Sequence, residues 1–153
     1  MTLVWRDNLT VDGSIIDEDH RHLIEIINRF EELGADGLTN DEGLEILYAL
    51  KFYAQTHFKR EESIQNEIDY PYRESHAQEH KHLIRTLELA FDDVKKQGNI
   101  LNASVVKEIT DLLKQWLVDH IIKSDLRMKP FIEARSFEKS NLEKLSDIEI
   151  EFS

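Results

Sequence analysis

Side chains that bind metals recur at regular spacings in this chain. Four stretches each contain a histidine, and three of them carry a second ligand-type group four or five residues later. The candidate ligands are His20, His57, Glu61, His76, His80, His120 and Asp125. Five neutral imidazoles and two carboxylates suit a pair of borderline divalent ions such as iron, and they are too many for one tetrahedral zinc ion. The pattern therefore predicts a dinuclear metal centre.

The spacing of these residues indicates which of them share a helix face. His57 and Glu61 are four residues apart, as are His76 and His80, so each pair stacks on one face with Cβ atoms roughly 5–6 Å apart. Asp125 follows His120 by five residues, which on a helix rotates it by about 140° and suits it to bridging two ions rather than to chelating one. The other two histidines, His22 and His82, each lie two residues from a candidate ligand and are expected to face solvent.

Hydrophobic periodicity places all four stretches on amphipathic helices. The first helix is expected to start at Asp17 as its N-cap and to run to about Leu33. The second is expected over about 41–65, and the third over about 72–98. The fourth is expected from residue 102 or 104 to Met128, with Pro130 as a stop. Glycine and proline are scarce, and most of them lie between or at the ends of these stretches. The sequence predicts an all-α fold, an up-down-up-down antiparallel four-helix bundle.

Two flanking segments lack a clear helical period. Residues 1–16 contain apolar side chains and are expected to lie along the bundle as an N-terminal arm. Residues 131–153 form an acidic C-terminal extension that ends Ile-Glu-Ile-Glu-Phe-Ser. Its alternation is compatible with a short strand, a docking segment or a disordered tail. The expected domains are a bundle with its arm over 1–130 and an extension of unknown role over 131–153.

Composition limits the classes of partner. The 153 residues suffice for one domain with one core, and 31 acidic against 19 basic residues give a formal net charge of −12. Such a surface repels phosphate backbones and anionic lipid, so we expect neither a nucleic-acid nor a membrane partner. The chain has no cysteine, which excludes disulfides and thiolate metal sites. It shows no apolar stretch of membrane-spanning length and no signal peptide, so the expected location is the cytoplasm.

Two other metal-binding patterns overlap the same residues. The stretch from His76 to His80 fits the H-x-x-E-H pattern of inverted zinc peptidases, with Glu79 as the general base. Those enzymes need further ligands and a substrate cleft, which a small bundle does not offer. Glu79 and His82 also match the Glu-x-x-His element of ferritin-like di-iron proteins, but a second copy of that element is absent. Both interpretations are less favoured than a centre that uses all seven ligands.

The complete ligand pattern, together with its flanking residues, resembles the hemerythrin family, in particular its single-domain bacterial members. The resemblance covers about residues 3–130. It includes Trp5 in the arm, the sequence Ile-Asp-Glu-Asp-His over 16–20, and Trp-Leu-Val-Asp-His-Ile over 116–121. No expected ligand is missing. The segment after Pro130 is not covered by the family pattern, which therefore implies nothing about its role.

The resemblance also implies how the ligands divide between two irons. His76, His80 and His120 would hold one iron, and His20 and His57 the other. Glu61 and Asp125 would bridge them together with a solvent-derived oxygen, which leaves the second iron one ligand short at the place where molecular oxygen would bind. Two ferrous ions, two carboxylates and one hydroxide sum to a charge of +1, which is small enough to be buried.

Reversible oxygen binding needs an apolar cavity that admits a diatomic gas and withholds protons. The residues one helical turn from the ligands are the candidates for its lining: Ile24, Leu83, Ile84, Trp116 and Leu117. Tyr53 is the polar exception, positioned either to bond a ligand or to reach solvent. We expect a monomeric oxygen carrier, store or sensor that is not an enzyme, with the C-terminal extension as a possible contact for a protein partner. The alternative is a di-iron enzyme that consumes peroxide or nitric oxide on the same scaffold.

Overall fold

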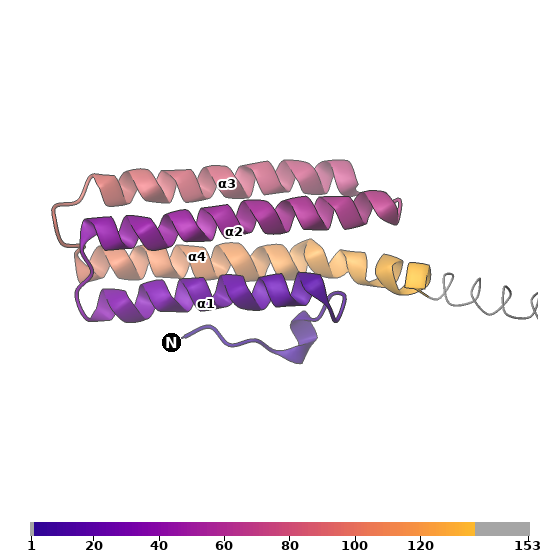
Figure 1. Cartoon of the computed structure of the whole chain (residues 1–153), viewed down its shortest axis with the longest axis horizontal. Helices are drawn as coiled ribbons and strands as arrows, with labels where there is room; N and C mark the ends of the chain where they lie inside the picture. Colours follow the sequence, from indigo (N-terminus) through magenta and orange to yellow (C-terminus); the bar gives the residue numbers. More distant parts are fainter. Residues whose placement is uncertain (1, 137–153) are drawn as a thin grey trace, which may run out of the picture.

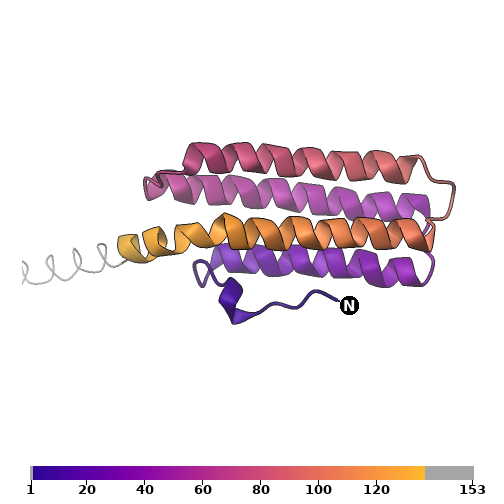
Figure 2. The same cartoon turned by 180° about the vertical axis from the view of Figure 1, so that it is seen from behind.

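Four antiparallel helices form the body of this computed structural model, which describes residues 2–136 (Figure 1). They are α1 (Ile15–Ala35), α2 (Asn40–Glu67), α3 (Arg73–Lys95) and α4 (Ala103–Lys123). Short connections make each helix run opposite to the preceding one, which is also visible from behind in Figure 2. The predicted all-α, up-down-up-down bundle is confirmed.

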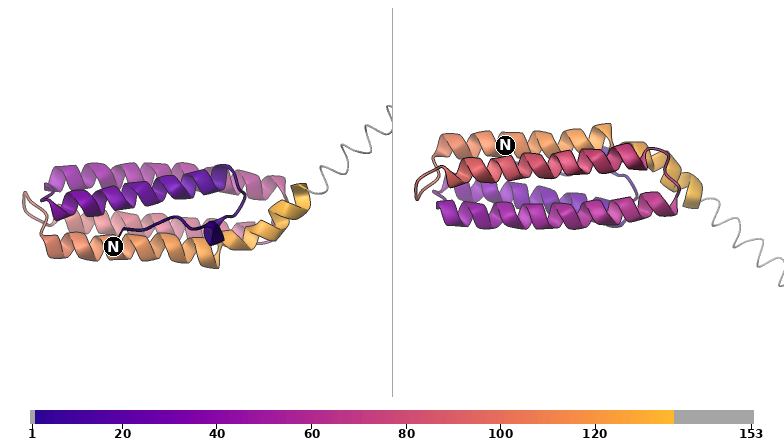
Figure 3. Two further views of the ribbon diagram at one scale, coloured as in Figure 1. Left: turned by 90° about the horizontal axis from the view of Figure 1, so that it is seen from below. Right: turned by 90° about the horizontal axis from the view of Figure 1, so that it is seen from above.

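The core lies between the helices, where α1 packs against α2 and α4, and α2 packs against α3 (Figure 3). Apolar side chains spaced three or four residues apart form one inward face on each helix. The fully buried members include Ile27 and Phe30 on α1, Leu47 on α2, Leu87 on α3 and Leu113 on α4. Removing these side chains from water is the main force that holds the helices together.

The loops that follow α1 and α3 meet at one end of the bundle. The N–H of Leu101 donates to the carbonyl of Leu38 at 2.9 Å, which joins the two loops. Gly34, near the end of α1, lies so close to Val106 of α4 that a Cβ atom on the glycine would come within 2.2 Å of the valine side chain. The absence of a side chain at position 34 therefore allows α1 and α4 to approach each other at this end.

The residues before α1 lie along the bundle as the predicted arm, which contains the short 3-10 turn η1 (Asp7–Leu9) (Figure 1). The backbone N–H of Leu3 donates to Asn28 Oδ1 at 2.9 Å, and Asn28 Nδ2 donates back to the Leu3 carbonyl at 2.8 Å. The Arg21 guanidinium lies 4.7 Å from the ring centre of Trp5. These contacts attach the arm to α1.

The start of α1 differs from the prediction that Asp17 is its N-cap. The helix begins at Ile15, and the carboxylate of Asp12 accepts the hydrogen bonds of backbone N–H groups in the first turn. Asp17 is buried inside that turn and accepts from the N–H groups of Val11 and Gly13, both at 2.8 Å. Asp17 therefore binds the arm to the helix, while the capping role belongs to Asp12.

The end of α4 also differs from the prediction. The helix ends at Lys123 rather than Met128, and the 3-10 turn η2 (Asp125–Met128) follows after Ser124. Ser124 has a φ of −122° and a ψ of −56°, which interrupts the regular helix. This interruption changes the direction in which Asp125 points, because it no longer follows the helical spacing from His120.

Pro130 does not stop the chain from being helical. Residues 129–136 are helical, so the proline occupies the first turn of a new segment, where its missing N–H would have had no helical partner. The alternating sequence over 148–153 lies outside the described residues. Within residues 2–136, no helix combines the length and the apolarity that crossing a membrane requires.

Candidate metal centre

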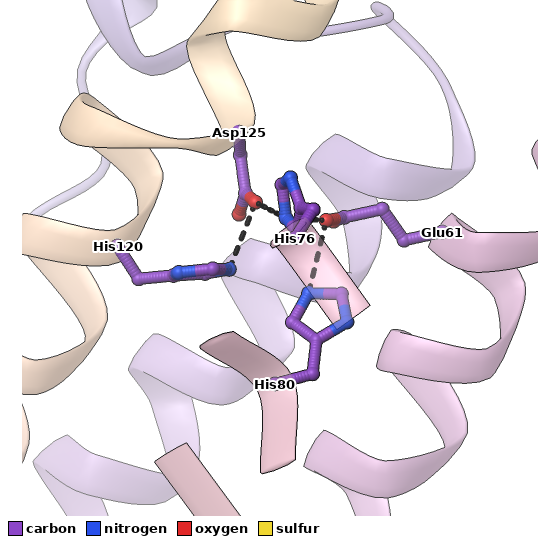
Figure 4. Close-up of side chains that lie close together, drawn as sticks. All are labelled: Glu61, His76, His80, His120 and Asp125. Atoms are coloured by element: carbon purple, nitrogen blue, oxygen red, sulfur yellow. Dashed lines mark ion pairs between the residues drawn. The ribbon is translucent and has the colours of Figure 1, made fainter. Parts of the chain in front are cut away.

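All seven sequence-predicted ligands come together at one end of the bundle. The antiparallel arrangement brings the beginnings of α1 and α3 beside the ends of α2 and α4, and each of the seven residues is at least nine-tenths buried. Five of them converge in Figure 4. The set consists of His20 on α1, His57 and Glu61 on α2, His76 and His80 on α3, His120 on α4 and Asp125 on η2.

Three histidines gather around one oxygen of each carboxylate (Figure 4). Glu61 Oε1 lies 2.7 Å from His76 Nε2 and 3.2 Å from His80 Nε2. Asp125 Oδ1 lies 2.9 Å from His76 Nε2 and 3.0 Å from His120 Nε2. This three-histidine group thus contains five close donor atoms.

The remaining two histidines gather around the other oxygen of each carboxylate. Glu61 Oε2 lies 3.0 Å from His57 Nε2, and Asp125 Oδ2 lies 2.9 Å from His20 Nε2. Within each of the two groups, the potential ligand atoms all lie within 4.8 Å of one another. Glu61 and Asp125 therefore belong to both groups and give one oxygen to each.

These atoms are close together, yet they are not aligned as hydrogen bonds. All five Nε2 atoms and all four carboxylate oxygens are buried without a hydrogen-bond partner. A buried polar group left in this state costs about 1–3 kcal/mol, and more where the group is charged. Converging lone pairs on neutral imidazoles and carboxylates are what a divalent ion requires, so the residues present fit a metal ion in each group.

Three comparisons with known proteins bear on this geometry. The family model described as the hemerythrin HHE cation binding domain matches residues 12–132. The chain belongs to the hemerythrin family. Among its relatives is a bacteriohemerythrin from Clostridium acetobutylicum, 30% identical over 125 residues that cover 80% of this chain and 95% of the relative. A bacteriohemerythrin from Pseudomonas aeruginosa is 28% identical over 80% of this chain and 76% of its own length.

Solved structures agree on the fold of this hemerythrin-family chain. A crystal structure of wild-type hemerythrin superposes with a TM-score of 0.72 and 23% sequence identity, covering 86% of this chain and 98% of the other. A crystal structure of a hemerythrin mutant gives the same TM-score of 0.72 over the same shares. The bundle is therefore the hemerythrin bundle.

Charge in the hemerythrin-type cluster is balanced by protons when no metal is bound. Burial alone would lower the pKa of His57, but its hydrogen bond to Asp19 and the nearby Glu61 carboxylate raise that pKa to about 10. Burial likewise opposes protonation of His76, whose pKa the Asp125 and Glu61 carboxylates raise to about 10. Burial would raise the pKa of Asp125, but the surrounding histidines hold it well below its usual value. Protons and metal ions consequently compete for the same imidazoles.

Asp125 reaches the cluster because α4 ends before it. An unbroken helix would carry its side chain about 140° away from His120. Instead the chain leaves the helix at Ser124, whose N–H still donates to the His120 carbonyl at 2.9 Å and whose hydroxyl donates to Glu79. The predicted bridging position of this carboxylate thus depends on a local interruption that the periodicity of α4 did not indicate.

Three carboxylates lie next to the outer nitrogens of the candidate ligands. Asp19 Oδ2 is 2.9 Å from His57 Nδ1. Glu62 Oε2 is 3.7 Å from His80 Nδ1, and Glu79 Oε2 is 3.6 Å from His120 Nδ1. Carboxylates in such positions orient a metal-binding imidazole and increase its basicity. Glu79, the general base in the zinc-peptidase interpretation, therefore lies behind His120 rather than at the centre of the cluster.

The other polar residues considered near the centre are not members of the ligand cluster. The hydroxyl of Tyr53, which was expected to bond a ligand or to reach solvent, donates to Asp19 Oδ1 at 2.9 Å. Both His22 and His82 are exposed, as predicted. Because His82 faces away from the cluster, the Glu-x-x-His element that it would form with Glu79 does not contribute to this site.

An apolar pocket that is too narrow to hold a water molecule lies against His20, His57 and His120. Three of the expected lining residues, Leu83, Trp116 and Leu117, contact it, and Leu23 and Phe58, which were not predicted, line it as well. Ile24 and Ile84 are not among its lining residues. The complete lining is His20, Leu23, His57, Phe58, Leu83, Trp116, Leu117, His120 and Asp125. Phe58 directly follows the candidate ligand His57, and this is the sequence signal that would have identified it; in the structure its ring stacks on His80 with ring centres 4.0 Å apart.

Proposed function

We propose that this chain binds molecular oxygen reversibly at a non-haem di-iron centre held by His20, His57, Glu61, His76, His80, His120 and Asp125. The observation that carries the proposal is the division of the carboxylate oxygens. Glu61 and Asp125 each present one oxygen to the three-histidine group and the other to the two-histidine group. Carboxylates that bridge two ions have this arrangement, and borderline ions such as ferrous iron match the donor set.

The two groups differ in the number of donors, which favours binding of a small ligand at one of them. One group offers five donor residues and the other offers four, with Glu61 and Asp125 counted in both. A solvent-derived oxygen shared by both ions would leave the two-histidine ion one ligand short of six. When bound, the iron pair supplies the electrons and the open position that oxygen binding requires.

The surrounding side chains protect that position from water and acid. The pocket touches His20 and His57, and its remaining lining is mostly apolar. Among its lining residues there is no Lys, Arg, Ser or Tyr to supply a proton. The one lining N–H outside the histidines, Trp116 Nε1, is engaged by the Leu83 carbonyl at 3.1 Å. These features support a carrier, store or sensor over an enzyme that turns oxygen or peroxide over.

The experiment combines metal analysis with reversible exposure to oxygen. Protein produced in iron-replete cells is expected to contain two irons per chain, and one metal per chain would contradict the dinuclear centre. After anaerobic reduction, oxygen should produce a visible absorption band that disappears when the solution is purged. Sustained consumption of peroxide or nitric oxide over many turnovers, without a reversible band, would instead establish the enzyme alternative.

A further inference from the structure

We infer that Asp19 is a positioning residue for the iron held by His20 and His57, and that Arg60 and Tyr53 hold Asp19 in place. This inference rests on the proposed di-iron function. Asp19 comes from α1 and the other side chains from α2, where Tyr53, His57 and Arg60 are spaced four and three residues apart and so share one helix face. All three converge on the Asp19 carboxylate.

Asp19 accepts four hydrogen bonds although its side chain is only 1% exposed. Its Oδ1 accepts from Tyr53 Oη at 2.9 Å and from Arg60 Nη2 at 2.6 Å. Its Oδ2 is 2.9 Å from both Arg60 Nε and His57 Nδ1. The guanidinium thus binds both oxygens in a fork, which fixes the plane of the carboxylate.

When a metal ion displaces one proton from His57, this network determines which ring nitrogen keeps the other. Both oxygens of Asp19 are acceptors, so His57 must present its Nδ1–H to Asp19. The lone pair of Nε2 is then directed toward the cluster, where Glu61 Oε2 lies 3.0 Å away. The carboxylate also makes the imidazole a stronger donor to a metal ion, which stabilises the ferric state in particular.

The other outer nitrogens are supported less firmly. Nδ1 of His20, the second histidine of the same group, is buried without any hydrogen-bond partner. The carboxylates behind His80 and His120 lie 3.7 Å and 3.6 Å away, beyond hydrogen-bond length. Rigid support for the two-histidine iron therefore comes chiefly through His57 and Asp19.

The informative substitution is Asp19→Asn, which keeps the shape and removes the charge. Each oxygen of Asp19 faces at least one donor that cannot turn round, so the amide nitrogen of an asparagine must meet either Arg60 or His57. The variant is expected to release one of its two irons to a ferrous chelator roughly 10–100-fold faster than the wild type, while the second iron leaves at a rate close to the wild-type rate. Its reduction potential should rise, because the ferric state loses an anionic partner.

Exposed neighbours provide the controls. Glu18→Gln removes one negative charge from α1, as Asp19→Asn does one residue away, and Lys59→Gln removes one positive charge from α2, as Arg60→Gln does; Glu18 and Lys59 are both exposed. Neither control should alter iron release or the potential. Arg60→Gln should shift both quantities in the direction of Asp19→Asn by a smaller amount, and Arg60→Lys should recover part of the effect by restoring the charge without the fork.

A purely structural role for Asp19 would give a different pattern. General destabilisation would loosen both irons together and leave the potential unchanged. If Asp19→Asn holds both irons and has the same potential as Glu18→Gln, the inference is wrong while the di-iron function stands. If the wild type itself does not hold two irons, the proposed function fails before Asp19 is tested.

Discussion

Toward the loop-joined end of the bundle, Phe30, Leu47, Leu87 and Leu113 belong to one apolar core and have essentially no exposed surface. At the other end, interior positions are taken by five imidazoles and two carboxylates that are also buried, none of them more than 8% exposed. The apolar end is held by its own packing, and the Thr110 hydroxyl is a buried polar group there that has no hydrogen-bond partner. The polar end leaves seven imidazole nitrogens and the four oxygens of Glu61 and Asp125 without a hydrogen-bond partner in the protein.

This difference suggests that the apolar part of each helix stabilises the fold and that the polar part of the same helix binds the ligand. Packing at the apolar end contributes to the free energy of unfolding. This contribution offsets the cost of burying groups without hydrogen-bond partners at the polar end. The short 3-10 turn η2 and the arm close the polar end over a second apolar cluster of Val11, Ile16, Tyr70 and Met128. This second cluster shields the polar groups from water but forms no hydrogen bonds with them.

The largest effect is expected from a cavity in the apolar end. Phe30→Ala removes a fully buried aromatic ring and should lower the free energy of unfolding of the metal-free protein by about 3–5 kcal/mol, measured by urea denaturation. The folded variant should still bind two irons per chain. Leu89→Ala, at a residue that is 50% exposed, is the control and should change stability by less than about 0.5 kcal/mol. A folded Phe30 variant without iron would show that the two ends are not separable.

A substitution at the polar end should weaken iron binding strongly and change the free energy of unfolding less. His120→Ala empties one position in the three-histidine group and leaves Asp125 without one of its neighbours, so iron binding should weaken by more than roughly 100-fold. The free energy of unfolding of its metal-free form should fall by less than that of the Phe30 variant. His82→Ala should retain iron and visible absorption. Retention of iron by His76→Ala, with its loss in the His82 variant, would show that the register assigned to α3 is wrong.

Dependence on pH should also distinguish the two ends. The pKa values of His57 and His76 are raised from 6.5 to about 10 in the metal-free protein, so protons must leave before iron can bind. Iron affinity should rise between pH 6 and pH 8 by up to about tenfold per pH unit for each proton displaced. Because the folded pKa values exceed the unfolded ones, these histidines stabilise the metal-free fold fully below about pH 6.5. That contribution is lost as the pH rises through about 10.

Two measurements check this dependence. Competition with a chelator at several pH values gives the iron affinity, and urea denaturation of the metal-free protein gives its stability. An iron affinity that does not change between pH 6 and pH 8 would contradict the competition between protons and metal. The Phe30 variant should show the same pH slope as the wild type, since its altered residue lies at the other end of the bundle.

The smallest effect is expected at the boundary between the two ends, where the pocket lies. Trp116→Ala or Leu117→Ala should admit water to the two-histidine side and increase the rate of autoxidation several-fold, while oxygen still binds initially. The loss of the visible band over time, measured in air, gives this rate. Rapid autoxidation of the wild type, repeated turnover with peroxide and no effect of either substitution would favour the enzyme alternative.

Residues that follow helical spacing were the ones predictable from the sequence. Candidate ligands such as His57 and Glu61 occupy gaps in an apolar stripe, and a side chain in such a gap must enter the core whatever its neighbours are. The bundle, its helix order and the exposure of His22 and His82 follow from the same periodicity. The hydrophobic periodicity behind these predictions can be determined for each helix by itself.

Features that depend on contacts between elements were not predictable in this way. Asp17 has the residue type of an N-cap, but the arm supplies N–H groups that bind it more directly. Asp19 looks like any acidic residue in a first turn until Arg60 of α2 is brought beside it. The interruption at Ser124 has no glycine or proline to announce it, and the hydroxyl's bond to Glu79 on α3 accompanies it.

The interruption at Ser124 makes the two ends unequal in their tolerance of changes in chain length. The stretch 121–124 sets both the rotation and the height at which Asp125 returns to the cluster, and a single inserted residue on a helix turns everything after it by about 100°. An insertion or deletion there would remove a carboxylate from both histidine groups at once. The loop around Gly98 is exposed and can be lengthened without moving any candidate ligand. Natural or engineered variation in the length of this chain should therefore accumulate at the loop-joined end and be rejected between His120 and Asp125.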